Sequence, residues 1–349
     1  MQLGTDERSL APADLDRCVT VAGAGSIGVA WALVFARRGW EVAVFEPDLG
    51  RRRLVPIELE RRLAALATAG LADEATATIA GRVAVHDNLA SAVESACYVQ
   101  ECAPEDLSVK RMLFEELDKV APSGCILASS SSTLRISQVC EGLACAGRSL
   151  VAHPGNPPYL IPIVELVPAP FTLPATVDGA EAILRSVGMS TVRLRREVEG
   201  FVFNRLQGAV LREAYCLVRD GVAAPEDIDR VMRDGPGRRW SILGPFEVAE
   251  LNTRGGIEAH ARRLGPAYTR MGAERGQSDP WDDDLVATVS KAVQARFPRG
   301  SWEEHVAWRD QALMTLEACR RAHPALSGPP PVGAPRLAAS TERASDEEL

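Results

Sequence analysis

The chain has 349 residues, of which 46% are hydrophobic and 25% charged, and its formal net charge at pH 7 is −8. These proportions are typical of a globular protein with room for two domains, and the negative charge argues against nucleic acid or an anionic membrane as a general partner. No apolar run reaches the ~18 residues of a membrane span, and the eight cysteines show no CxxC pair or zinc-ligand spacing. We therefore expect a cytoplasmic protein with free thiols and no metal site.

The first 195 residues alternate between short apolar strands and amphipathic helices. Residues 18–23 (CVTVAG) and 41–48 (EVAVFEPD) are typical of buried strands, and residues 26–40 between them of a helix that ends near Gly39. The alternation continues with helices at 49–70, 89–96 and 107–121, and with strands at 82–87, 97–103 and 125–132. This order predicts a parallel sheet with helices on both faces, which is a doubly wound α/β fold.

After residue 195 the strand signal ends and the pattern becomes helical. Residues 200–221 (GFVFNRLQGAVLREAYCLVRDG) carry apolar side chains every three or four positions, and 224–235 (APEDIDRVMRDG) have a proline and acids in the first turn. The sequence therefore predicts four parts: a flexible leader (1–16), a doubly wound α/β domain (17–195), an all-helical domain (196–325) and a disordered, proline- and charge-rich tail (326–349).

A glycine-rich turn lies between the first predicted strand and the first helix. The sequence VAGAGSIG places Gly23, Gly25 and Gly28 in the GxGxxG spacing. In the dinucleotide fingerprint the first glycine permits the tight turn, the second lets the backbone approach a diphosphate, and the third lets helix and strand pack closely. Ser26 and Ile27, at the start of the helix, belong to the same predicted site. The alternative is an ordinary glycine turn.

Glu46, at the end of the second predicted strand, indicates which dinucleotide is bound. Its carboxylate can accept hydrogen bonds from the adenosine ribose and would repel a 2′-phosphate, so it favours NAD over NADP. The arginine triplet 51–53 leaves a second interpretation open, because arginines at this place can hold a 2′-phosphate. The simpler interpretation of the triplet is a solvated helix face.

His153 follows a late strand of the predicted sheet, and the carboxyl ends of such strands are where ligands bind. Glu165 lies twelve residues further on, where a returning strand could bring its carboxylate to one imidazole nitrogen and fix the tautomer. The alternative is a rigid, proline-rich turn with an incidental histidine. The other four histidines are predicted to be structural or on the surface.

Several segments in one order resemble the 3-hydroxyacyl-CoA dehydrogenase superfamily, with its lambda-crystallin branch nearest. They are ECAPEDLSVK (101–110), ASSSSTLRIS (128–137), HPGNPPYLIPIVELVP (153–168), GFVFNRLQ (200–207) and GPGRRWSILGPFEVAELN (235–252). The resemblance runs from about Cys18 to about Ala322. It implies that residues 17–195 form a Rossmann-type NAD-binding domain and that the helical domain at 196–325 binds the substrate. It also implies NAD as cofactor and a homodimer formed through the helical domain.

The resemblance also implies roles for individual residues. His153 would be the general base toward the C3 hydroxyl of the substrate and Glu165 its orienting partner, while Ser132 and Asn204 would hydrogen-bond the reacting oxygen. The structural alternatives are a polar strand end for Ser132 and a helix N-cap for Asn204.

Three more residues match cofactor-contacting positions of the family. Asn156 would lie near the nicotinamide, and Glu105 and Lys110 would contact the cofactor; the alternative for this last pair is a surface ion pair. Gly155 departs from the pattern, since relatives carry a bulkier apolar residue there, and its lack of a side chain is expected to enlarge the pocket or loosen the turn.

The substrate implied by the nearest branch is a free 3-hydroxy carboxylic acid similar to L-gulonate, which NAD would oxidise to the 3-keto acid. Arg239 matches an arginine of that branch and could clamp a carboxylate, unless it is only an exposed helix-end residue. A 3-hydroxyacyl-CoA or carnitine remains an alternative substrate. The stretch LERRLAALATAG has no lysine for a CoA phosphate, although Arg61 or Arg62 could meet one. A non-catalytic, NAD-binding structural protein is the third alternative.

Overall fold

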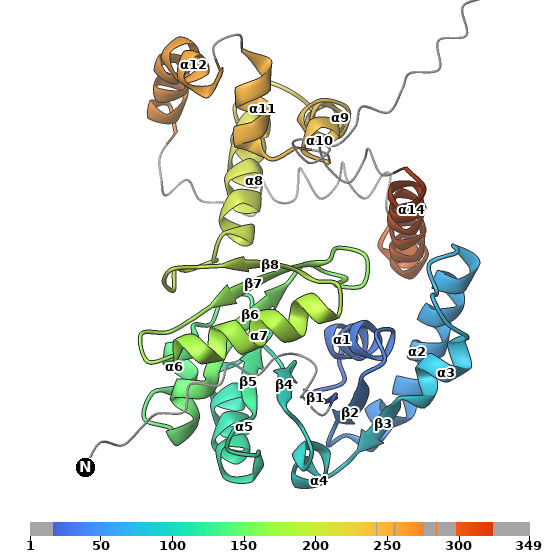
Figure 1. Ribbon diagram of the computed structural model, residues 1–349. Coiled ribbons are helices and arrows are strands. Elements are labelled where there is room, and N and C mark those ends of the chain that lie inside the picture. The colour runs from blue at the N-terminus through green and yellow to red at the C-terminus, as the bar shows by residue number, and fades with distance from the viewer. Residues whose placement is uncertain (1–16, 242, 254–255, 276–283, 285–297, 324–349) are drawn as a thin grey trace, which may run out of the picture. The chain divides into compact units, whose positions relative to one another are not determined.

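The computed structural model describes residues 17–241, 243–253, 256–275, 284 and 298–323 (Figure 1). The predicted leader at 1–16 and tail at 326–349 lie outside these residues. The chain divides into two compact units, one of Met1–Pro225 with Pro280–Thr315 and the other of Glu226–Asp279 with Leu316–Leu349.

The first unit is built on an eight-stranded sheet in the order β3-β2-β1-β4-β5-β6-β7-β8. Its strands are β1 (Cys18–Ala22), β2 (Glu41–Phe45), β3 (Val83–His86), β4 (Tyr98–Glu101), β5 (Ile126–Ser129), β6 (Ser149–Pro154), β7 (Ile163–Val167) and β8 (Ser190–Arg193). The strand order reverses between β1 and β4, so a crevice is expected outside the carboxyl ends of these two strands. The predicted doubly wound α/β fold is confirmed.

The last two strands differ from the predicted parallel sheet, because β8 pairs parallel with β7, and β7 runs antiparallel to β6. Only residues 155–162 join β6 to β7, and a parallel return needs a crossover of a dozen residues or more. The short return places Glu165 directly opposite His153 in the register of the pair.

Helices pack on the sheet along its whole width. They are α1 (Ser26–Ala36), α2 (Leu49–Thr68), α3 (Thr76–Gly81), α4 (Leu89–Val93), α5 (Leu107–Val120), α6 (Ile136–Cys140), the 3₁₀ helix η1 (Ala144–Arg148) and α7 (Pro174–Ser186). Helix α1 packs on β1, β2 and β4, α4 on β1 to β3, and α7 on β5 to β8 (Figure 1). A buried cluster that includes Val99, Phe114 and Leu127 joins α5 to the middle of the sheet.

The remaining described elements are helical, as predicted. They are α8 (Phe203–Arg219), α9 (Pro225–Asp234), α10 (Pro236–Trp240), α11 (Pro245–Asn252), α12 (Gly256–Ala273), the 3₁₀ helix η2 (Arg299–Ser301) and α14 (Trp302–Ala322). Helix α8 belongs to the first unit, and α10 to α12 belong to the second. Among the described helices, none is long and apolar enough to cross a membrane. Five of the eight cysteines are buried.

Candidate active site

The glycine-rich turn connects β1 to α1 and leaves the amino end of that helix open. Gly23 has φ +108, and a Cβ atom there would lie 2.8 Å from the Cys102 carbonyl. A Cβ on Gly28 would lie 2.0 Å from the Gly23 oxygen, whereas one on Gly25 would meet nothing within 4 Å. Gly25 is the N-cap of α1, and no side chain caps that end. The turn therefore offers free backbone N–H groups and space beside them, which suits a diphosphate.

Glu46, just beyond the end of β2, is held against this turn. Its two carboxylate oxygens accept hydrogen bonds from the backbone N–H groups of Ala24 and Asp48, each at 3.0 Å. A carboxylate oxygen can accept more than one hydrogen bond, so the ribose hydroxyls of a dinucleotide can still bind to it. Turn and carboxylate together fit the adenosine half of NAD.

A cavity of about 560 Å³ lies near the carboxyl ends of β4, β5 and β6. It is lined by Ile27, Cys102, Ala103, Glu105, Lys110, Ser130, Ser132, His153, Pro154, Asn156, Ile161, Phe203, Asn204 and Gln207. The structure thus brings six predicted site residues and Ile27 of the glycine turn into one cavity. Its volume is that of an ordinary small-molecule site.

The His153 side chain is almost fully buried and has one nitrogen engaged. Nδ1 lies 2.8 Å from Oε2 of Glu165, which faces it from β7. Because a carboxylate only accepts, this contact holds the proton on Nδ1 and leaves Nε2 as the basic nitrogen. Only 5% of His153 is exposed, yet the residue lines the cavity. The pair is therefore built like a general base with its orienting group.

The second oxygen of Glu165 ties the pair to the start of α8. Oε1 accepts hydrogen bonds from the backbone N–H groups of Val202 at 2.8 Å and Phe203 at 3.0 Å. Just before them, buried Phe201 has φ +50, a left-handed conformation that is uncommon for a bulky residue. The Phe201 and Phe203 rings lie 5.5 and 6.1 Å from the imidazole, centroid to centroid. Sequence analysis did not single out these aromatic residues, although GFVFN contains both.

Ser132 and Asn204 meet at the mouth of the same cavity. The Asn204 side chain donates from Nδ2 to the backbone oxygen of Ser132 at 3.1 Å. Asn204 is the second residue of α8, whose N-cap is Val202, so the alternative that it serves as an N-cap is wrong.

Glu105 and Lys110 form a partly buried polar cluster with Glu101 rather than a surface pair. Lys110, 1% exposed, donates to Glu101 Oε1 at 2.8 Å and lies 3.4 Å from Glu105 Oε2. Burial raises the pKa of Glu101. Burial also opposes ionisation of Glu105, but hydrogen bonds from Ser131 and Thr133 and the Lys110 charge outweigh it and lower the Glu105 pKa to about 2. Glu105 is therefore ionised at neutral pH, and its carboxylate lines the cavity beside the Lys110 ammonium.

Gly155 does not leave the space that its missing side chain suggested. A Cβ atom there would lie 2.6 Å from Cγ2 of Ile161 and 2.8 Å from Cγ2 of Ile163. Those two methyl groups fill the volume, and the residue is buried. The expectation of an enlarged pocket is therefore wrong, because Ile161, which lines the cavity, has taken the room.

A buried polar chain that sequence analysis missed reaches the cavity from the middle of the sheet. The Tyr98 hydroxyl donates to Gln100 Oε1 at 2.6 Å, and Gln100 Nε2 donates to Ser130 Oγ at 2.7 Å. Cys102 Sγ lies 3.2 Å from the same Ser130 hydroxyl oxygen. Burial raises the Cys102 pKa to about 12, so the sulfur stays a neutral thiol. The alternating pattern of YVQEC predicts a strand, but it does not predict this series of hydrogen bonds.

Arg239 lies on α10, in the second compact unit, and its role stays a prediction from the resemblance. The other residues assigned to the cofactor, Gly23, Gly25, Ser26, Gly28 and Glu46, lie at the glycine turn or beside it.

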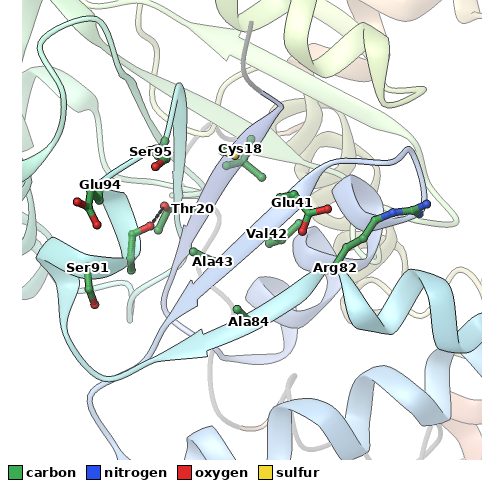
Figure 2. A pocket seen from close by; sticks show the side chains of 13 residues that line it. Cys18, Thr20, Glu41, Val42, Ala43, Arg82, Ala84, Ser91, Glu94 and Ser95 are labelled. Carbon is green, nitrogen blue, oxygen red and sulfur yellow. Dashed lines mark hydrogen bonds between the residues drawn. The ribbon is translucent and has the colours of Figure 1, made fainter.

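A smaller hollow of about 180 Å³ lies between α4 and strands β1 to β3 (Figure 2). Charged and polar side chains line it, among them Glu41, Arg82, Ser91 and Glu94. Cys18 and Glu41, which open β1 and β2, also line it, so it lies toward the amino ends of the strands. Ligands of such sheets bind at the opposite ends, which favours the His153 cavity as the active site.

Comparison with known proteins agrees with this geometry. The model of the 3-hydroxyacyl-CoA dehydrogenase NAD binding domain matches residues 18–198, and that of the C-terminal domain of the same enzymes matches residues 200–295. A lambda-crystallin homolog of Bos taurus is 41% identical over 316 residues, which cover 88% of this chain and 96% of the relative.

Two further relatives carry names with an activity. L-Carnitine dehydrogenase of Streptomyces griseus is 39% identical over 315 residues, covering 88% of this chain and 90% of that one. Among solved structures, a 5-formyl-3-hydroxy-2-methylpyridine 4-carboxylic acid 5-dehydrogenase, described as an NAD⁺-dependent dismutase, is similar with a TM-score of 0.74. It is 25% identical, with 88% of this chain and 98% of that chain covered.

Proposed function

We propose, on the premise that this chain belongs to the 3-hydroxyacyl-CoA dehydrogenase family, that it oxidises a free 3-hydroxy carboxylic acid. The family and the relatives indicate an NAD-dependent dehydrogenase acting on a CH–OH group. The substrate we propose is L-gulonate or a similar acid, with the 3-keto acid as product. The contact between His153 Nδ1 and Glu165 Oε2 carries the mechanistic part of the proposal.

In this mechanism the residues of the chain move the proton and hold the reacting oxygen. NAD, when bound, accepts the hydride from C3. Glu165 keeps the proton on Nδ1 of His153, so Nε2 takes the proton of the C3 hydroxyl as its oxygen becomes a carbonyl. Ser132 and Asn204 line the same cavity and would donate hydrogen bonds to that oxygen. Phe201 and Phe203 keep water from the buried imidazole.

Asn156, Glu105 and Lys110 would bind the cofactor on one side of the cavity. All three line the cavity, and the backbone donors that fix Glu105 include the N–H of Ser132 at 3.0 Å. This hydrogen bond links the cofactor side to the serine at the reacting oxygen. We therefore assign these residues to the nicotinamide half of NAD.

Two observations favour a free acid over an acyl-CoA. Carnitine, the substrate named for one relative at 39% identity, is itself a free 3-hydroxy carboxylic acid. In addition, two nitrogens of the Arg62 guanidinium on α2 already donate to Ser26, so the turn competes with a CoA phosphate for this side chain. Arg61, exposed on the same helix, is then the alternative phosphate ligand. The resemblance assigns the substrate carboxylate to Arg239, and this assignment stays a prediction.

A panel assay tests the proposal. The purified protein is mixed with NAD and L-gulonate, L-carnitine or 3-hydroxybutyryl-CoA, and NADH is followed by absorbance. We expect turnover of a free acid, and a loss of roughly 10²- to 10⁴-fold in kcat for His153→Ala. Activity on the thioester alone would overturn the substrate, and full activity of His153→Ala would overturn the mechanism. NADH binding without turnover of any hydroxy acid would support a structural role instead.

We further propose a cytoplasmic homodimer formed through the second unit. Large apolar side chains on α9, α11 and α12 are exposed in the single chain, namely Val231, Phe246, Leu251 and Met271. Exposed apolar surface of this kind marks interfaces. Light scattering should give twice the mass of the chain, and Phe246→Glu, at a side chain 77% exposed, should lower it. A monomer before substitution would refute this.

A further inference from the structure

Helix α2 holds an acid between two arginines on one face. The two terminal nitrogens of Arg51, Nη1 and Nη2, donate to the carboxylate of Glu58, at 2.5 and 2.8 Å. Arg62, one turn further along, brings its own guanidinium to 3.8 Å from the same carboxylate. The exposed fractions of these side chains are 24%, 23% and 11% for Arg51, Glu58 and Arg62. The triplet around Arg51 is therefore not simply the solvated helix face expected from the sequence.

Both arginines also reach back to the glycine turn. Arg51 Nε donates to the backbone oxygen of Ala24 at 2.5 Å. Arg62 donates to the backbone oxygen of Ser26 at 2.9 Å and to its hydroxyl at 3.0 Å. Since Glu46 accepts from the N–H of Ala24, side chains hold both backbone polar atoms of this residue. Helix α2 thus clamps the reverse side of the turn.

This clamp has a direct consequence for the dinucleotide. The N–H groups at the open end of α1 bind a diphosphate well only if the turn keeps one orientation, and glycines alone do not impose it. Fixing the carbonyls of Ala24 and Ser26 removes that freedom before the ligand arrives, so less ordering is required on binding.

We propose that Glu58, acting through Arg51 and Arg62, is a positioning residue for the phosphate-binding turn and withholds Arg51 from a 2′-phosphate. A guanidinium that already forms a bidentate pair with a carboxylate has few donors left for a second anion. The hydrogen bonds between Arg51 and Glu58 raise the pKa of Arg51 and lower that of Glu58. Arg51 and the ribose-binding acid Glu46 both bond to the backbone of Ala24, so the two side chains meet at the same residue of the turn. Glu58 therefore assists Glu46 in favouring NAD over NADP.

Coenzyme titrations test this inference without any substrate. Glu58→Gln is compared with Glu60→Gln, an exposed acid on the same helix, by NADH and NADPH fluorescence. We expect Glu58→Gln to raise the NADH dissociation constant about tenfold, the effect of losing one charge-assisted interaction. The ratio of the NADPH dissociation constant to the NADH dissociation constant should also fall toward one. Glu60→Gln should leave both constants within about twofold of the wild type.

Two results would overturn the inference. Equal NADH dissociation constants for the Glu58 and Glu60 variants would refute the role of Glu58 in positioning the turn. An unchanged ratio of the NADPH and NADH dissociation constants would refute the claim that Glu58 withholds Arg51 from a 2′-phosphate. If Glu58→Gln does not fold, Arg51→Lys keeps the charge but loses the bidentate pair, with exposed Arg53→Lys as control; NADH binding should then weaken only for the first. With a substrate in hand, Glu58→Gln should raise KM for NAD and leave kcat at saturation unchanged, a split that general damage to the fold would not give.

Discussion

Replacing Glu165 with glutamine tests the assignment of His153 more sharply than removing the imidazole, because both oxygens of Glu165 are in use. Oε2 faces Nδ1 of His153, and Oε1 accepts from the N–H groups of Val202 and Phe203. Glutamine has the same shape but only one oxygen. If that oxygen accepts from the two backbone donors, the amide NH₂ must face Nδ1.

An NH₂ group at Nδ1 reverses the tautomer. Nδ1 then has to accept, the proton moves to Nε2, and the nitrogen that faces the substrate can no longer act as a base. The opposite orientation of the amide would set its NH₂ against two backbone donors and leave both unsatisfied, at about 1–3 kcal/mol each. We therefore expect kcat to fall roughly 10²- to 10⁴-fold, which corresponds to about 3–5 kcal/mol in the activation barrier.

The assay compares kcat on the active member of the substrate panel with NADH affinity measured by fluorescence. Glu199→Gln, at an exposed acid near the same turn, is the matched control. We expect the Glu165→Gln variant to bind NADH as the wild type does and to lose turnover, while the control keeps both. A Glu165→Gln kcat within about threefold of the wild type would refute the reasoning, since either the tautomer or the base would then be misassigned.

Three further predictions concern the walls of the cavity. Hydrogen bonds and the Lys110 charge hold the pKa of folded Glu105 at about 2, below the usual 4.5, so its stabilising contribution is present above pH 4.5 and is lost as the pH falls toward 2. Denaturant unfolding should therefore show a gap between wild type and Glu105→Gln at pH 6 that shrinks by pH 3. Cys102, with its pKa raised to about 12, should resist iodoacetamide at neutral pH while exposed Cys319 is alkylated, as read by peptide mass spectrometry; rapid labelling of Cys102 would contradict its burial. Gly155→Val should displace Ile161 and lower the free energy of unfolding by about 1–3 kcal/mol in denaturant melts, and an unchanged stability would show that the wall yields without strain.

The sequence is informative where a local pattern and a structural requirement coincide. Gly23 and Gly28 sit where a side chain would strike the backbone, so their spacing predicts the turn, and the strand before it and the acid after it follow the same rule. The antiparallel β7 could also have been inferred, because residues 155–162 are too few for a crossover. By contrast, the left-handed conformation of Phe201 has no local signal, and the two N–H groups that follow it bond to Glu165 on a strand distant in sequence.

The arginines of α2 show why charge near a ribose site is a poor guide to the coenzyme. In sequence, Arg51 can equally be a surface residue or a ligand for a 2′-phosphate, because both fit an arginine just after the second strand. What decides is the partner, and the partners are Glu58, seven residues on, and a backbone carbonyl of the turn, 27 residues back. The seven-residue spacing of Arg51 and Glu58 shows in the sequence that both lie on one helix face. The contact of Arg51 with the turn, by contrast, forms only when α2 packs beside α1. An arginine that is already paired adds rigidity to the turn rather than affinity for phosphate, so coenzyme preference follows from the pairing of such residues and not from their number.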